Sequence, residues 1–293
     1  MTVTGRPPDN RHSLLRTAVA GRLAPTRLIA DLAGYDAEGR LCFLPGCGGI
    51  APGVHLGDRI DQWVADHLMP GACAEAEEDP AVPGAFHELA CIGNRVRDAS
   101  GRFIGTVVGK RGGLAPGFMP PNLVAIDAPD VMLEDLVPGD RIVLEAEGRG
   151  LAILDLPEVG IFNLSPGGLD RLPIAAREGV LDCRVKAVVS PRVAGAGVGQ
   201  SPWIGDVEIA GDEVLAGSLA ELRFGDLVAF DSMDGRVSRF YRPGFCTIGI
   251  VSHGPSPVPG HGPGLTVVLS GPNEALNLVL DAGATLASLL PPG

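Results

Sequence analysis

The segment from residue 244 to 264 holds two of the six histidines of the chain. An apolar run over residues 247–252 predicts a strand that delivers His253 into a loop of proline and glycine, and His261 follows in the same loop. Because proline fixes φ and glycine permits tight bends, this loop can hold both imidazoles in place. Such rigidity suits metal binding or acid–base catalysis. The alternative is that one histidine caps a turn and the other lies in water.

Asp66 and His67 form a second candidate group. The side chains of consecutive residues diverge, so we expect that Asp66 does not orient the ring of His67. Either residue could still join the loop histidines as a ligand or a base. The alternative is a helix end, stopped by Pro70 and Gly71.

Asp206 and Glu208 alternate, so both carboxylates face the same side of any strand formed there. A carboxylate pair on one face could bind a cation or share a proton, and Asp206 is also a candidate for binding substrate. The alternative is a solvated strand face.

Lys110 and Arg111 follow a predicted strand over residues 103–108, which a predicted hairpin turn at Ser100 and Gly101 precedes. Flanking glycines expose backbone N–H groups, so this pair could bind a carboxylate or phosphate group, with Asn94 as a further contact. The alternative is that both cations form surface ion pairs with some of the 35 acidic residues.

Stronger catalytic signatures are absent from the sequence: it contains no Gly-x-Ser-x-Gly elbow, no His-Glu-x-x-His motif and no kinase signature. The small-residue run at 194–201 lacks the context of a dinucleotide fingerprint and the Lys-Ser/Thr of a P-loop. We therefore expect no nucleotide cofactor and interpret this run as a flexible loop, such as a lid. Cys42 and Cys47 have no second close cysteine pair, so no zinc knuckle is expected.

The composition favours a β fold. Glycine (42 residues) and proline (26) are too costly inside helices for a long helical bundle, whereas 45% hydrophobic residues can build a sizeable core. Helices are expected only at residues 10–20, as an arm, and 58–67. Short apolar segments between turn residues predict strands at 103–108, 141–145, 181–189, 227–230, 247–252 and 265–269.

An internal echo supports small barrels. The leucine-containing segment 133–140, which ends in Gly139-Asp140, matches the segment 219–226, which ends in Gly225-Asp226. A weaker copy ends in Gly57-Asp58. It predicts turns in which glycine supplies an unusual backbone angle and aspartate bonds the turn amides, so these aspartates are expected to be structural. We predict an all-β fold with few helices and two or three small β-barrel-like subdomains with long Gly/Pro-rich loops. The predicted divisions are 1–129 (loop-rich, with the helical arm), 130–190, and 191–293, which contains the histidine loop.

The net charge of −12 repels nucleic acid and anionic membranes, so neither is an expected partner. Residues 1–11 lack the apolar stretch of a signal peptide, and no run approaches the 18 apolar residues of a spanning helix. We expect a cytoplasmic protein with reduced cysteines.

Several short motifs occur along the chain: Asp66-His67-x-x-Pro-Gly, Gly93-Asn94, Ser100-Gly101, Gly105 through Gly109-Lys110-x-Gly112-Gly113, Asn163-x-x-Pro166, the glycines at 195–199, Gly205-Asp206, Leu222-Arg-Phe-Gly-Asp226 and Gly260-His261-Gly-Pro-Gly264. Taken together, these motifs resemble an uncharacterised prokaryotic family, domain of unknown function 4438, over most of the chain from about Gly34. The resemblance implies a mostly β fold with barrel-like subdomains and a homo-oligomer, without an established activity. Three positions depart from the family pattern: Arg111 stands where a histidine is usual, and Pro255-Ser256 replaces an Asp-Cys pair after His253.

We expect a metal- or histidine-dependent hydrolase or lyase that acts on a small polar, anionic metabolite. The expected ligands of a divalent metal such as zinc are His253, His261 and His67. The expected catalytic groups are these histidines and Asp66, and the expected substrate contacts are Lys110, Arg111, Asn94 and Asp206. The alternative is a non-catalytic, homo-oligomeric small-molecule-binding or scaffold protein. An enzyme should bring these groups into one pocket, whereas scatter over several faces favours the scaffold.

Overall fold

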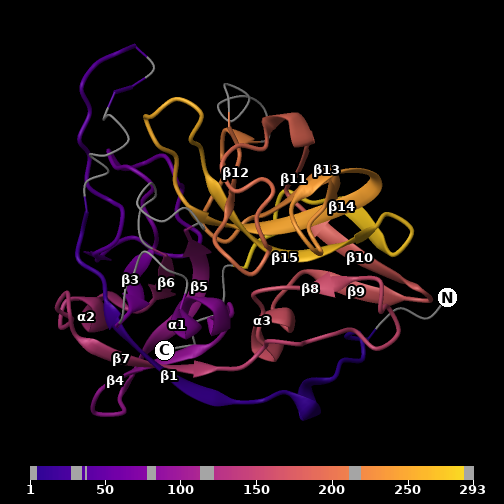
Figure 1. Ribbon diagram of the computed structural model, residues 1–293, viewed down its shortest axis with the longest axis horizontal. Helices are drawn as coiled ribbons and strands as arrows, with labels where there is room; N and C mark the ends of the chain where they lie inside the picture. The colour runs from indigo at the N-terminus through magenta and orange to yellow at the C-terminus, as the bar shows by residue number, and fades with distance from the viewer. Residues whose placement is uncertain are drawn as a thin grey trace.

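A computed structural model describes residues 5–27, 35–36, 38–77, 84–112, 122–210 and 219–286. Their strands form a closed barrel and two further sheets (Figure 1). The longest α-helix of these residues, α1, has only five residues. The predicted all-β fold with few helices is therefore confirmed.

The barrel contains six strands from the first half of the chain. They pair in the order β1-β7-β4-β5-β6-β3, and β3 pairs back with β1 to close the ring, while β2 extends β3 on the outside. In β7, Ile142, Leu144 and Ala146 point inward and are buried, as the two-residue period of a strand requires. The bounds are β1 Thr17–Leu23, β2 Ile50–Ala51, β3 Gly71–Ala76, β4 Arg95–Asp98, β5 Phe103–Arg111, β6 Leu123–Asp127 and β7 Arg141–Ala146, with helices α1 Ala85–Leu89 and α2 Asp130–Leu133.

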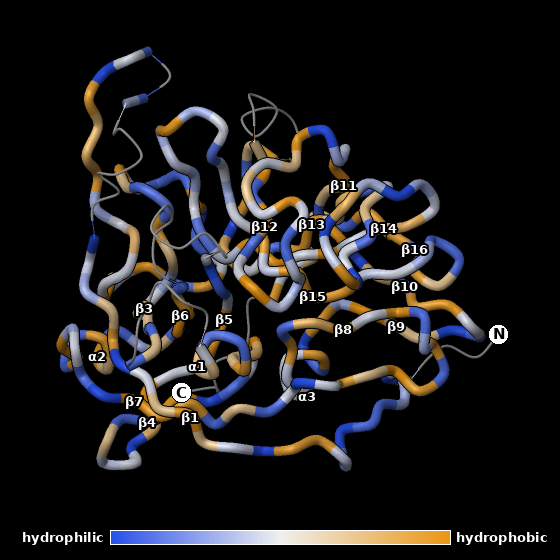
Figure 2. The backbone as a smooth tube through the Cα atoms, viewed as in Figure 1, coloured by the Kyte–Doolittle hydropathy of each residue, from blue (hydrophilic) through white to orange (hydrophobic). Residues whose placement is uncertain are grey.

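The C-terminal half forms one larger and one smaller sheet. The larger, here called the C-terminal sheet, has the order β11-β13-β14-β15-β12, with β8 also paired to β15. The smaller has the order β16-β10-β9. Hydrophobic residues concentrate along these strands, whereas many of the loops are hydrophilic (Figure 2). The bounds are β8 Gly160–Ile161, α3 Pro166–Leu169, β9 Ile174–Arg177, β10 Val180–Val185, β11 Ala187–Val189, β12 Val207–Glu208, β13 Leu227–Asp234, β14 Phe240–His253, β15 Gly264–Pro272 and β16 Leu276–Leu280.

All six predicted segments form strands, but the segment at 181–189 divides into β10 and β11, which belong to different sheets. Both predicted helices are wrong. Residues 10–20 form a short 3₁₀ turn at Arg11–Ser13 and then enter β1, where pairing with β7 outweighs the weak helical pattern. Residues 58–67 form a series of turns. The last of them, His67, has a φ of 52°, which a right-handed helix cannot contain.

The Gly-Asp turns are confirmed. Gly57, Gly139 and Gly225 all have φ between 90° and 97°, in the left-handed region. The aspartate after each glycine accepts a hydrogen bond from the backbone N–H three residues earlier, at 2.8 to 2.9 Å. Strands β7 and β13 begin directly after the second and third turns, so these aspartates are structural.

The barrel and the C-terminal sheet meet along β5. A Cβ atom on Gly109 would lie 2.4 Å from the Cβ of Ser252, so glycine permits the close approach of β5 to β14. On the next residue, the Lys110 N–H donates to the Thr266 hydroxyl at 2.8 Å, and the Ser252 hydroxyl donates to the Lys110 carbonyl at 3.2 Å. This contact, here called the seam, positions the candidate site.

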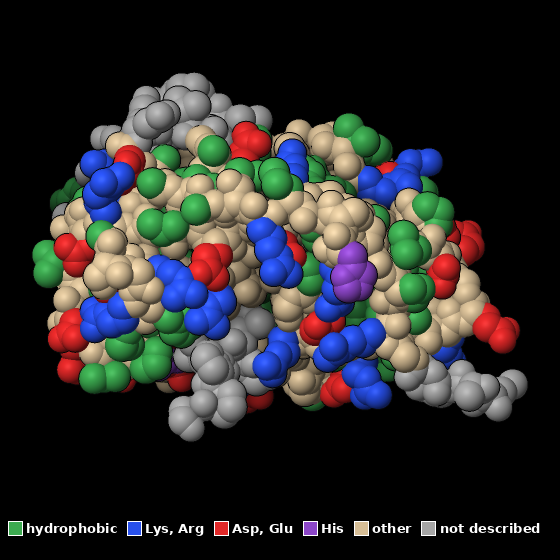
Figure 3. Space-filling view, turned by 90° about the horizontal axis from the view of Figure 1, so that it is seen from below, with side chains coloured by type: hydrophobic (Ala, Val, Ile, Leu, Met, Phe, Trp, Pro, Cys, Tyr) green, Lys and Arg blue, Asp and Glu red, His purple; other side chains and the backbone are tan. Residues whose placement is uncertain are grey.

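Charges at the surface are often paired. Arg40 lies 2.7 Å from Asp36, and Arg102 lies 2.9 Å from Asp98. Figure 3 shows basic and acidic side chains close to one another on one face of the molecule. Within the described residues, no helix combines the length and the apolar character that crossing a membrane requires.

Candidate metal centre

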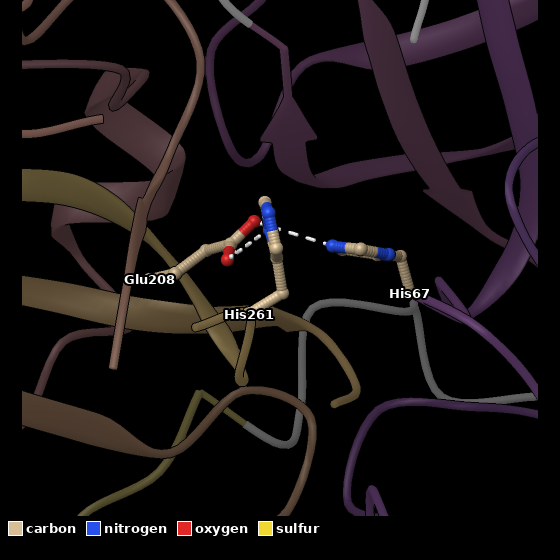
Figure 4. Close-up of side chains that lie close together, drawn as sticks. All are labelled: His67, Glu208 and His261. Carbon is tan, nitrogen blue, oxygen red and sulfur yellow. Dashed lines mark hydrogen bonds and ion pairs between the residues drawn. The ribbon is translucent and has the colours of Figure 1, made fainter. Parts of the chain in front are cut away.

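Three segments far apart in the sequence bring three histidines and three carboxylates together at the seam. The His67 ring lies 5.0 Å from the His253 ring and 5.5 Å from the His261 ring, centroid to centroid. Figure 4 shows His67 approaching from one side, and Glu208 and His261 from the other. Two sets of residues each offer ligand atoms within 4.8 Å of one another: His67, Glu208 and His261, and Asp206, Glu208 and His253.

The Asp66–His67 pair depends on the unusual backbone of His67. Its positive φ turns the ring alongside Asp66, so that Nδ1 lies 2.6 Å from Asp66 Oδ1. The expectation that Asp66 cannot orient the adjacent ring is therefore wrong, because it assumed an ordinary backbone. The His67 N–H donates to the Pro255 carbonyl at 3.2 Å, and the Gly254 N–H donates to the Leu68 carbonyl at 2.8 Å. These bonds join the turn to the histidine loop.

Asp206 directly precedes the short strand β12 and Glu208 ends it, and the two carboxylates face the same side, as predicted. Their side chains are buried, so the alternative of a solvated face is wrong. The run at 194–201, expected to be a lid, instead packs on this strand: the Gly195 N–H donates to the Glu208 carbonyl at 2.8 Å, and the Glu208 N–H donates to the Ala196 carbonyl at 2.9 Å. The small residues thus let a backbone approach closely and support the two carboxylates.

His253 ends β14 and faces Asp206. Its Nε2 lies 2.9 Å from Asp206 Oδ2, and its Nδ1 lies 2.7 Å from the Gly254 carbonyl oxygen. The other Asp206 oxygen accepts the Gly112 N–H at 3.0 Å. A Cβ on Gly264 would lie 1.9 Å from His253 Nε2, so only glycine leaves room for this pair.

Two of the rings have more acceptors than a neutral imidazole can satisfy. His67 lies between Asp66 at Nδ1 and Glu208 at Nε2, the latter at 3.2 Å, while His253 lies between the Gly254 carbonyl and Asp206. A neutral ring has one N–H. Each ring therefore needs one additional cation, which is either a second proton or a metal ion.

The donor set suits a divalent metal ion. Two histidines, one glutamate and a water form a common catalytic zinc site. Ligands about 2.1 Å from a tetrahedral ion lie about 3.4 Å apart. His67 Nε2 lies 3.2 Å from Glu208 Oε1, and His261 Nδ1 lies 2.9 Å from Glu208 Oε2, so a small outward movement would admit an ion.

The electrostatics keep the carboxylates ionised. Burial raises the pKa of Glu208, but hydrogen bonds with His261 and His67 outweigh it, and the net pKa is lowered. Burial likewise raises the pKa of Asp206, but the charge and the hydrogen bond of His253 together with the charge of Arg111 outweigh it, and the net pKa is lowered. The hydrogen bond to Glu208 raises the pKa of His261.

Arg111 extends toward the same cluster. Its side chain is buried, and one guanidinium nitrogen, Nη1, lies 3.2 Å from Cys47 Sγ. Burial lowers the pKa of Arg111, but Cys47, Asp206 and Glu208, together with Asp66, outweigh it and raise the pKa. The guanidinium is thus a fixed positive charge beside the carboxylates.

Lys110 and Asn94 make other contacts. The Lys110 amine lies 2.9 Å from Asn163 Oδ1 and also contacts the backbone carbonyls of Glu88 and Trp203. Asn94 accepts the Cys91 N–H and donates to the Glu147 carbonyl. The structure therefore brings Asp66, His67, Arg111, Asp206, His253 and His261 together, and it places Lys110 and Asn94 in separate networks.

Glu208 is the member of both ligand sets that the predicted site residues omit. The sequence pattern that could have identified Glu208 is its alternation with Asp206, which predicts that both carboxylates face one side of a strand. The role of Gly264 cannot be predicted from the sequence, because only the structure shows that its missing side chain leaves room for His253 and Asp206.

The comparisons with known proteins agree with this fold. The model described as "Domain of unknown function (DUF4438), N-terminal" matches residues 34–170, and that described as "Domain of unknown function (DUF4438), C-terminal" matches residues 171–290. The solved structure titled "Crystal structure of TM1086" is 30% identical, with a TM-score of 0.86, over 96% of this chain and 98% of that chain. No curated protein matches the chain.

Proposed function

This chain belongs to the DUF4438 family, and we propose that it is a metal-dependent hydrolase or lyase acting on a small anionic metabolite. His67, Glu208 and His261 bind one divalent ion, such as zinc. The observation that supports this most directly is the buried His67 ring, which has a carboxylate at each nitrogen and needs a second cation.

The proposed chemistry uses the unfilled position of the ion. A zinc ion with three protein ligands lowers the pKa of bound water to about 7 and so supplies hydroxide near neutral pH. An ion held by these residues would thus supply the nucleophile of a hydrolase or the base of a lyase. The His261 side chain is 17% exposed, whereas His67 is fully buried, so substrate would approach from the His261 side.

Arg111 would attract the anionic group of the substrate. A guanidinium can bind a carboxylate or phosphate group through two parallel hydrogen bonds, and Arg111 brings one into this cluster. Homo-oligomerisation and a cytoplasmic location stay predictions from the sequence and the family resemblance.

The test is metal binding by protein purified without a histidine tag. We expect bound zinc after loading and gel filtration, and we expect His67→Ala and His261→Ala to lose it. His12→Ala, which changes an exposed histidine, is the matched control. Zinc content unchanged in both cluster variants would contradict the ligand assignment.

Activity should then be compared between zinc-loaded and chelated protein on small anionic esters, amides and phosphate monoesters. Metal-dependent turnover that His261→Ala abolishes is the expected result. A protein that binds no zinc and turns over none of these substrates would favour the non-catalytic scaffold.

A further inference from the structure

We infer that the centre takes a second divalent ion, bound by Asp206, Glu208 and His253, and that Glu208 bridges the two ions. This inference rests on the proposed function, because the first ion shares Glu208. It would make the centre binuclear, with both ions at the seam.

The placement of Glu208 supports the bridge. Its Oε1 faces His67 and its Oε2 faces His261, and the same carboxylate belongs to the set with Asp206 and His253. Ions in two-metal sites lie about 3.5–4 Å apart. The 5.0 Å between the His67 and His253 rings puts two ligands of different ions at a compatible spacing.

The second set is arranged as a metal site would require. The Gly254 carbonyl can only accept, so it places the His253 proton on Nδ1 and leaves the Nε2 lone pair facing Asp206. The Gly112 N–H holds one Asp206 oxygen and leaves the other facing the ring. Gly264 leaves the space around both atoms open, since a Cβ there would lie 1.9 Å from His253 Nε2 and 2.7 Å from Asp206 Oδ2.

The charges predict an order of filling. Asp66, Asp206 and Glu208 carry three negative charges and Arg111 one positive charge, so a single divalent ion neutralises the group. A second ion leaves two positive charges, which further anionic ligands, such as an anionic substrate, would neutralise. The second ion should therefore bind more weakly than the first and should bind better with an anion present.

The experiment measures zinc stoichiometry and the coupling between ions in the full-length chain. We expect two zinc ions per chain at saturation, and an electron paramagnetic resonance spectrum of exchange-coupled pairs in the manganese-loaded protein. Asp206→Asn, which keeps the shape of the side chain, should reduce the stoichiometry to one. It should weaken the first ion less than His261→Ala does, because it removes a nearby charge and not a ligand of that ion. Glu208→Gln should weaken both sites, and His12→Ala should change neither.

The outcomes separate the second site from the proposed function. One zinc ion in both wild type and Asp206→Asn, lost in His261→Ala, would overturn the second site and keep the first. In that case nuclear magnetic resonance should find His253 doubly protonated beside Asp206. No bound zinc in wild type would overturn the proposed function as well. Two uncoupled manganese ions would overturn the Glu208 bridge, and circular dichroism of each variant excludes misfolding as the cause of a loss.

Discussion

Replacing Asp66 with asparagine should weaken zinc binding, although Asp66 is not itself a proposed ligand. Its carboxylate lies 2.6 Å from His67 Nδ1 and so keeps the ring proton there, with the Nε2 lone pair toward Glu208. An asparagine of the same shape can turn its amide to donate to Nδ1. The ring proton then moves to Nε2 and occupies the position of the ion.

The expected magnitude follows from the loss of an orienting partner. Removing such a partner lowers metal affinity about 10- to 100-fold, which corresponds to about 1.4–2.8 kcal/mol at 25 °C. We expect the upper half of this range, because both Asp66 and His67 are buried and water cannot replace the carboxylate. The assay is competition for zinc with a chromophoric chelator at pH 7.5.

Asp61→Asn is the matched control, since the Asp61 carboxylate bonds Arg59 near the surface. It should change zinc affinity less than twofold. Asp66→Asn with an affinity within twofold of wild type, in a folded protein, would refute the argument that Asp66 sets the His67 tautomer.

Three further predictions concern pH and packing. In the metal-free protein the pKa of His261 is raised and that of Glu208 is lowered, so their contact stabilises the fold between these two pKa values. This stabilisation is lost as pH rises through the pKa of His261 or falls through that of Glu208, and urea midpoints should show no such pH dependence in His261→Gln. Zinc affinity should fall at low pH, because protons then occupy His261. Gly264→Ala should lower the melting temperature and the zinc content, measured by calorimetry and elemental analysis, because its Cβ displaces His253. Burial lowers the pKa of Lys110 to about 8, so the folded protein releases this proton at a lower pH than the unfolded chain does. The free energy of unfolding, measured with urea, should therefore rise by up to about 3 kcal/mol between pH 8 and 10.5, and Lys110→Met should remove this rise.

The parts of the fold that depend on local sequence could be predicted. Five of the six apolar segments each lie within one strand, the segment at 181–189 divides into β10 and β11, and each Gly-Asp turn forms as expected. Turn chemistry and a two-residue period act within a few residues, so they can be predicted locally. The helix predicted at 10–20 does not form, because its conformation depends on contacts that are distant in the sequence. Pairing of β1 with β7, more than a hundred residues away, decided its conformation.

The site was predictable in its residue types but not in its assembly. His253, His261 and the Asp206–Glu208 alternation stand out in the sequence, since each is a local pattern. The Asp66–His67 contact depends on the positive φ of one residue, which a histidine adopts only where the surrounding structure enforces it. The separation of Lys110 from Arg111 follows from their alternation on β5, which sends neighbouring side chains to opposite faces.

The arrangement also explains why the metal ion and the fold should depend on each other. Asp66, Asp206 and Glu208 are buried together, a costly placement unless cations compensate their charge. Arg111 compensates one of them, and in the absence of metal the other two require protonated histidines. Neither half of the chain holds the complete set, because His67 precedes a barrel strand whereas Glu208 belongs to the C-terminal sheet. An ion that replaced the histidine protons, as proposed, would therefore also join the barrel to the C-terminal sheet, and its binding energy would stabilise the seam as well as the site.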